Sequence, residues 1–85
     1  MGEVSEIVRV LREDNLATPE GDLTMYATAY LEWRHAAANI AEHGPIVSHP
    51  RTGAPIENPY GKVRAAAMAT MQKLTRVRRT DRLWV

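Results

Sequence analysis

Apolar side chains recur at steps of three and four residues in three stretches of the chain, which is the spacing of an amphipathic helix. The first stretch contains Val4, Ile7, Val8 and Leu11. It predicts a short helix from about Ser5 to Asp14, inside an N-terminal segment that covers residues 1–17. Leu16 is expected to fold back after this helix.

The second and longest stretch follows Thr18 and Pro19. Threonine can cap the free amides of a helix, and proline fits the first helical position without losing a needed donor. The apolar stripe then consists of Leu23, Tyr26, Tyr30, Trp33, Ala37 and Ile40. We therefore predict a long helix within residues 18–43 that ends at Gly44. Aromatic residues on such a stripe are typical of a core, so Trp33 and the two tyrosines are assigned to the core.

Residues 44–58 interrupt this pattern, since Gly44 to Pro59 contains four prolines and two glycines. Short apolar pieces lie on either side of the sequence His49-Pro50-Arg51-Thr52-Gly53. Proline and glycine at these places favour a tight turn, so the segment is predicted to form a β-hairpin. Pro55 would confine its strand to an edge of the sheet.

A third helix is predicted within residues 59–79, because Asn58 and Pro59 repeat the start signal of the second helix. Its apolar stripe consists of Val63, Ala67, Thr70, Leu74 and Val77, and the helix is expected to end near Arg78. Residues 80–85 would follow as a basic and aromatic tail. The expected fold class is mainly α, in a single domain: a short N-terminal helix, then two long antiparallel helices joined by a small β-hairpin.

Four apolar side chains lie away from the seam that the two long helices would share. They are Met25, Leu31, Met68 and Met71. A second buried face follows from them, and two interpretations of it stay open. Either the first helix covers this face within the same chain, or the four residues form an interface between subunits, since exposed apolar patches commonly signal a partner.

The composition narrows the protein classes. A chain of 85 residues with 45% apolar residues can fold, but it has little room for a deep core, which makes oligomerisation plausible. The chain contains no cysteine, so disulfides and thiolate chemistry are excluded. Its longest apolar run, Ala65 to Ala69, is far too short to cross a membrane, and the start lacks the features of a secretory signal. We expect a cytoplasmic protein with no membrane partner.

Candidate catalytic and metal-binding residues form no recognisable site. The three histidines, His35, His43 and His49, lack the spacing of a metal-ligand set. The two serines, Ser5 and Ser48, lie in no nucleophile-elbow sequence, and the glycines match no phosphate-binding loop. We therefore expect no catalytic residue, no metal and no cofactor in this chain.

Charge is distributed unevenly, although the net charge is only +1. Residues 1–43 carry three basic and eight acidic side chains, whereas residues 60–85 carry seven basic ones against Asp81 alone. The seven are Lys62, Arg64, Lys73, Arg76, Arg78, Arg79 and Arg82. Arginine pairs well with phosphate, so this half is the candidate polyanion surface. The alternative is a solvated end whose cations complement the C-terminus of the third helix.

Four pieces of the sequence, taken in order, resemble the small subunits of tailed-phage terminases. They are residues 26–34 (YATAYLEWR), 40–44 (IAEHG), 53–59 (GAPIENP) and 65–74 (AAAMATMQKL). The resemblance implies a non-catalytic, ring-forming adaptor that binds viral double-stranded DNA. It also implies a partner, the terminase large subunit, which carries the ATPase and the nuclease.

Under this interpretation the long helices assemble the ring, and the basic side chains of residues 62–82 neutralise DNA phosphates in the host cytoplasm. Leu83 and Trp84 are a candidate docking element for DNA, the large subunit or a neighbouring protomer, unless they are buried on the chain's own core. Two other classes stay open. One is a helical protein-interaction module whose basic tail binds an acidic partner, and the other is a small metal-dependent nuclease.

Overall fold

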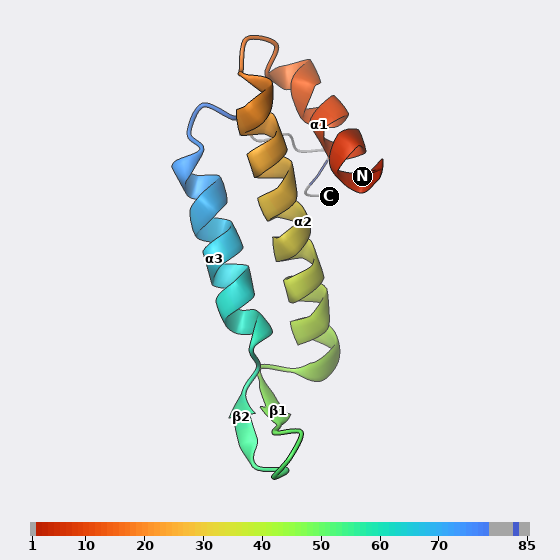
Figure 1. Ribbon diagram of the computed structural model, residues 1–85, viewed down its shortest axis with the longest axis vertical. Helices are drawn as coiled ribbons and strands as arrows, with labels where there is room; N and C mark the ends of the chain where they lie inside the picture. The colour runs from red at the N-terminus through yellow and green to blue at the C-terminus, as the bar shows by residue number, and fades with distance from the viewer. Residues whose placement is uncertain (1, 79–82, 84–85) are drawn as a thin grey trace.

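The computed structural model describes residues 2–78 and residue 83 (Figure 1). In chain order the elements are α1 (Gly2–Asp14), α2 (Glu20–His43), β1 (Ile46–Ser48), β2 (Pro55–Glu57) and α3 (Tyr60–Lys73). The fold is mainly α, as predicted, with one small antiparallel sheet. The molecule is elongated, with principal extents of 51 × 22 × 22 Å.

The central helix is α2, with α3 running antiparallel along one side of it and α1 along the other (Figure 1). The buried cluster consists of Ile7, Val8, Leu11, Leu23, Tyr26, Ala27, Ala29, Tyr30, Leu31, Met71 and Val77. Leu11 and Leu23 are completely enclosed. Burial of such a side chain contributes about 1.5–3 kcal/mol. Since α1 buries only Ile7, Val8 and Leu11, these few side chains supply most of the apolar packing between α1 and the rest of the molecule.

Helix α1 begins at Gly2, three residues earlier than the sequence predicted. The extra turn is held because Val4 packs against the buried cluster. After Asp14, the backbone N–H of Asn15 donates to the carbonyl of Arg12 (3.1 Å) and the chain turns. The guanidinium of Arg12 also pairs with the carboxylate of Glu20 (2.6 Å), which links the end of α1 to the start of α2.

Helix α2 ends at His43, as predicted, but it begins at Glu20, so Pro19 precedes the helix and is not its first residue. The first residue after Pro19 is helical, and the N–H groups of Asp22 and Leu23 donate to the carbonyl of Pro19. The hydroxyl of Thr18 donates to the carbonyl of Arg76 (3.4 Å). At the other end Gly44 has a positive φ of 85°, a conformation that glycine adopts at no steric cost.

The predicted hairpin is present, and its strands pair Ile46 with Glu57, Val47 with Ile56, and Ser48 with Pro55. Val47 and Ile56 are half-buried opposite each other on one face of the ribbon. The hairpin projects beyond the ends of α2 and α3, away from the buried cluster (Figure 1).

Helix α3 is shorter than predicted, because it ends at Lys73 and not near Arg78. The N–H of Leu74 donates to the carbonyls of Thr70 and Met71, and the chain then leaves the helix axis. Val77 reaches the buried cluster from the turn that follows and not from the helix. The segment after this turn makes a long-range contact that the local sequence does not reveal: the side chain of Asn15, the residue after α1, binds the backbone of Arg78.

The four apolar residues that lay off the predicted seam have different environments. Leu31 and Met71 belong to the buried cluster of the single chain, and Met68 packs against that cluster. Only Met25 is largely exposed, at 55%. The seam of α3 is correspondingly rotated, since Met71 is buried while Val63 from the predicted stripe is 38% exposed.

Candidate nucleic-acid interface

The described residues that directly follow α3 do not extend freely from it. Residues 75–78, which we name the returning segment, turn back towards the loop between α1 and α2 (Figure 1). The side-chain amide of Asn15 donates to the carbonyls of Leu11 (2.8 Å) and Arg78 (3.1 Å). Its oxygen accepts the N–H of Arg78 (2.5 Å). The backbone of Arg78 is therefore fixed to Asn15, directly after α1.

Leu83 also lies on the chain's own core. Its side chain is half-buried and packs against the buried cluster, and its carbonyl accepts a hydrogen bond from the Tyr30 hydroxyl. The sequence left open whether Leu83 docks on another molecule or is buried on the chain's own core, and the structure places it against its own helices. Trp84, the other residue of the predicted docking element, lies outside the described residues.

Replacing Asn15 by alanine is expected to lower the free energy of unfolding by about 2 kcal/mol, because the backbone N–H and carbonyl of Arg78 are deprived of their partner. Urea unfolding followed by circular dichroism would measure this. The matched control is Thr18→Ala, which removes one long, exposed hydrogen bond to the same segment and should cost under about 0.5 kcal/mol. Equal stabilities for the two variants would contradict the clamping role of Asn15.

The predicted DNA-binding cations are all exposed where the structure describes them, but they form two groups. Lys62 and Arg64 lie in the first turns of α3, next to the hairpin. Lys73 ends α3, and the returning segment carries Arg76 and Arg78 at the opposite end. The stretch of helix between Arg64 and Lys73 is about 14 Å long. Arg79 and Arg82 lie outside the described residues.

The two groups differ in their acidic neighbours. The loop that holds the returning segment directly follows Glu13 and Asp14, the last residues of α1, and Glu20 begins the next helix. The sequence of α3 contains neither aspartate nor glutamate. The cations of α3 therefore have no acidic neighbour on their own helix, and the nearby carboxylates come from other elements: Glu57 of β2 beside Gly61, and Glu32 of α2 in the groove along α3.

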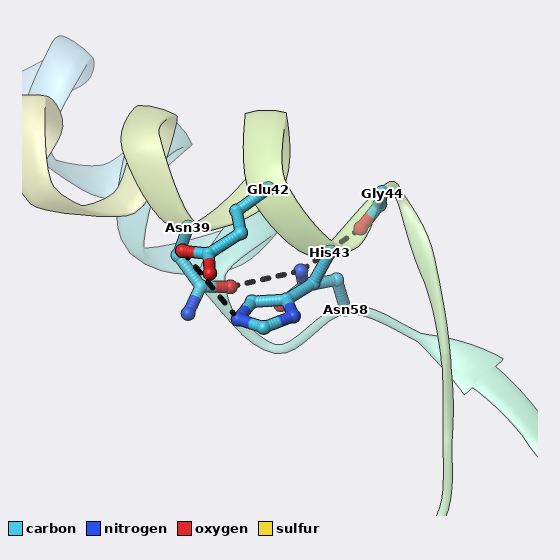
Figure 2. A network of polar contacts seen from close by, with 5 residues as sticks. All are labelled: Asn39, Glu42, His43, Gly44 and Asn58. Carbon is cyan, nitrogen blue, oxygen red and sulfur yellow. Dashed lines mark hydrogen bonds and ion pairs between the residues drawn. The ribbon is translucent and has the colours of Figure 1, made fainter.

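A buried asparagine fixes the junction between α2, the hairpin and α3 (Figure 2). Asn58 is 2% exposed, and its amide donates to the Asn39 side-chain oxygen (3.1 Å) and to the carbonyl of Gly44 (2.9 Å). Its oxygen accepts the N–H of Tyr60 (3.0 Å), which satisfies one free amide at the start of α3. Its own N–H donates to the carbonyl of Pro45 (2.7 Å). This junction sets the position of the hairpin relative to the cations of α3.

The turn of the hairpin is organised by a histidine that had no predicted role. The Nδ1 atom of His49 accepts the N–H groups of Arg51 (3.1 Å) and Thr52 (3.3 Å). The backbone of His49 exchanges hydrogen bonds with Gly53 and Ala54, both at 2.8 Å. One local signal could have revealed this role. His49 precedes Arg51 and Thr52 by two and three residues, and the backbone N–H groups of these two turn residues have no partner in the strand pairing.

The other two histidines have weaker contacts. His35 Nε2 lies 3.9 Å from Glu3, and His43 Nε2 lies 3.9 Å from the neighbouring Glu42 (Figure 2). Within residues 2–78 and 83, no group of three or more His, Asp or Glu side chains is arranged to hold a metal ion. None of the helices in this part of the chain is both long and apolar enough to span a membrane.

Comparison with known families places the chain in a family. The sequence matches the family model described as phage terminase, small subunit, over residues 4–76. This span runs from the first turn of α1 through the whole of α3 and into the returning segment. No curated protein and no solved structure matches the chain significantly.

Proposed function

We propose that this chain, which belongs to the phage terminase small-subunit family, is a non-catalytic adaptor that binds viral DNA and regulates the large terminase subunit during genome packaging. The match of the family model to residues 4–76 is the observation that carries the proposal. The adaptor acts as a homo-oligomer, as a ring, in the cytoplasm of the host cell. The ATPase and nuclease belong to the large subunit.

The distribution of cations supports a DNA-contacting role. Lys62, Arg64 and Lys73 lie on a helix whose sequence has no acidic residue, and Arg76 and Arg78 are exposed beyond it. Arg79 and Arg82 belong to the same proposed set. Exposed cations of this kind neutralise phosphates and release counterions, which favours binding at low salt.

The proposed subunit interface is centred on Met25, since Leu31, Met68 and Met71 contribute to or contact the core of the single chain. Met25 lies at a shallow groove of about 290 Å³ between α2 and α3. The groove is lined by Thr24, Met25, Thr28, Ala29, Glu32, Ala66, Ala67 and Thr70. Small side chains on both helices allow the close approach of a helix from another subunit.

Replacing Arg76, Arg78 and Arg79 together by alanine is expected to weaken binding of a DNA duplex and to flatten its salt dependence. The slope of log K against log salt should become shallower by about 0.9 for each phosphate that is no longer neutralised. Fluorescence anisotropy over a series of salt concentrations measures both quantities.

The control is the corresponding triple lysine variant, which keeps the charges and should keep the slope. An unchanged affinity of the alanine variant would remove the returning segment from the DNA site. A wild-type protein that binds no duplex even at low salt would contradict DNA binding altogether. It would favour the interaction-module alternative, in which the cations bind an acidic protein.

A further inference from the structure

We infer that the β1–β2 hairpin is the element that enters a groove of duplex DNA, with Arg51 at its turn contacting phosphate. This inference rests on the DNA-binding function proposed above. It places the principal DNA contact at the hairpin end of the molecule, in a segment that contains none of the DNA-binding residues predicted from the sequence.

The first argument is shape. The hairpin is a single two-stranded ribbon that projects beyond the helices (Figure 1). The major groove of B-DNA is about 12 Å wide and admits a two-stranded ribbon. Arg51 lies in the turn at the far end of this ribbon and is exposed, so it can reach phosphates that the helices cannot approach.

The second argument is the order of the turn before any DNA is bound. His49 Nδ1 accepts two backbone N–H groups, and the hydroxyl of Thr52 accepts the N–H of Ala54 (3.2 Å). Gly53, with a φ of 71°, allows the tight reversal that brings its N–H to the carbonyl of His49. A turn that is already ordered loses little conformational entropy when it binds, which increases affinity.

The third argument is charge. Between Pro45 and Ile56 the sequence has one arginine and no acidic residue. Lys62 and Arg64 lie at the base of the ribbon, on the helix that begins three residues after β2. Glu57 is the one acidic residue of the strands, and it also lies at the base and not at the turn. At the opposite end of the molecule the arginines lie near the acidic end of α1 and the acidic start of α2.

The turn also offers a second donor. Since Nδ1 of His49 accepts both backbone N–H groups, the proton of the neutral ring lies on Nε2. That N–H can donate to a phosphate oxygen or to an acceptor on a base edge. A ring N–H in the same turn as an exposed arginine suits a phosphodiester better than an apolar partner.

The test uses the full chain, a short DNA duplex and a salt series. Arg51→Ala is expected to weaken binding several-fold and to make the salt slope shallower by about one. The matched control is Arg9→Ala, which removes an exposed arginine from α1 and should leave the slope unchanged. If Arg51→Ala binds like the wild type, or if both variants weaken binding equally, the hairpin assignment is wrong while the adaptor function stands. If the wild type itself binds no duplex, the proposed function fails instead.

A second pair of variants tests the positioning role of His49. His49→Asn keeps an oxygen that can accept the two turn amides, whereas His49→Ala removes the acceptor. We expect His49→Ala to lose affinity to about the extent of Arg51→Ala and to speed amide hydrogen exchange at Arg51 and Thr52. His49→Asn should restore slow exchange and most of the affinity. Full affinity of His49→Ala, despite fast exchange at both amides, would overturn the argument from the ordered turn.

Discussion

Replacing Leu11 by alanine is expected to lower the free energy of unfolding by about 2–5 kcal/mol, the range for a fully enclosed leucine. Leu11 is 0% exposed and belongs to the cluster that α1 and α2 bury together. Its carbonyl also accepts the amide of Asn15, so a shift of α1 would disturb the clamp on the returning segment. Since small domains are stable by only about 5–15 kcal/mol, this loss threatens the fold. Urea unfolding followed by circular dichroism would measure it.

A leucine in the loop that follows provides the control. Leu16 is 84% exposed between α1 and α2, and Leu16→Ala removes the same atoms without opening a cavity. Its expected effect lies within about 0.5 kcal/mol. Similar losses from both substitutions would mean that α1 is not packed on α2 as described.

Asn58→Ala is expected to cost about 3 kcal/mol, because it leaves several polar groups at the junction without a partner. The carbonyl of Gly44 and the side-chain oxygen of Asn39 lose a donor, and the N–H of Tyr60 loses an acceptor. The loss affects the meeting point of α2, the hairpin and α3 (Figure 2). Thermal and urea unfolding would measure the stability, and hydrogen exchange would show whether β1 and β2 separate.

Asn39→Ala provides the comparison, since it removes only one of the hydrogen bonds of Asn58 and should cost about 1 kcal/mol. The junction interpretation requires Asn58→Ala to be clearly the more damaging substitution. Equal costs would indicate that the Asn39 hydrogen bond alone matters and that Asn58 does not organise the hairpin.

Local signals were sufficient to predict α2 and the hairpin. Pro19 and Gly44 mark the two ends of a long segment whose apolar residues recur every three or four positions. Proline and glycine residues likewise mark the ends of the two short apolar segments on either side of His49 to Gly53. Such signals act through the backbone preferences of neighbouring residues, so they can be read without knowledge of the fold.

The end of α3 could not be predicted in this way. Its apolar stripe continues to Val77, which suggested a longer helix. In the structure the helix ends at Lys73, and the backbone of Arg78 is hydrogen-bonded to the side chain of Asn15, which lies 63 residues earlier in the chain. The burial of Met71 in place of Val63 likewise depends on the rotation of α3 against α2. Interactions between distant parts of the chain override local preference at both places.

The candidate site shows the same limit. The predicted cations that the structure describes form two groups and not one surface, because the length of α3 separates Lys62 and Arg64 from Lys73 and Arg76. Counting charges could not reveal that Arg51 is presented by a turn that His49 orders. Both conclusions needed the topology of the hairpin and the helices.

The hydrogen bonds between Asn15 and Arg78 have a consequence for synthesis on the ribosome. Val77 and the backbone of Arg78 complete the packing around α1, yet they are translated after all three helices and the hairpin. A nascent chain that already exposes α1, α2 and the hairpin still lacks this closing interaction. We therefore expect the protein to reach its native stability only after residues 75–78 have left the exit tunnel, and not stepwise as each helix emerges.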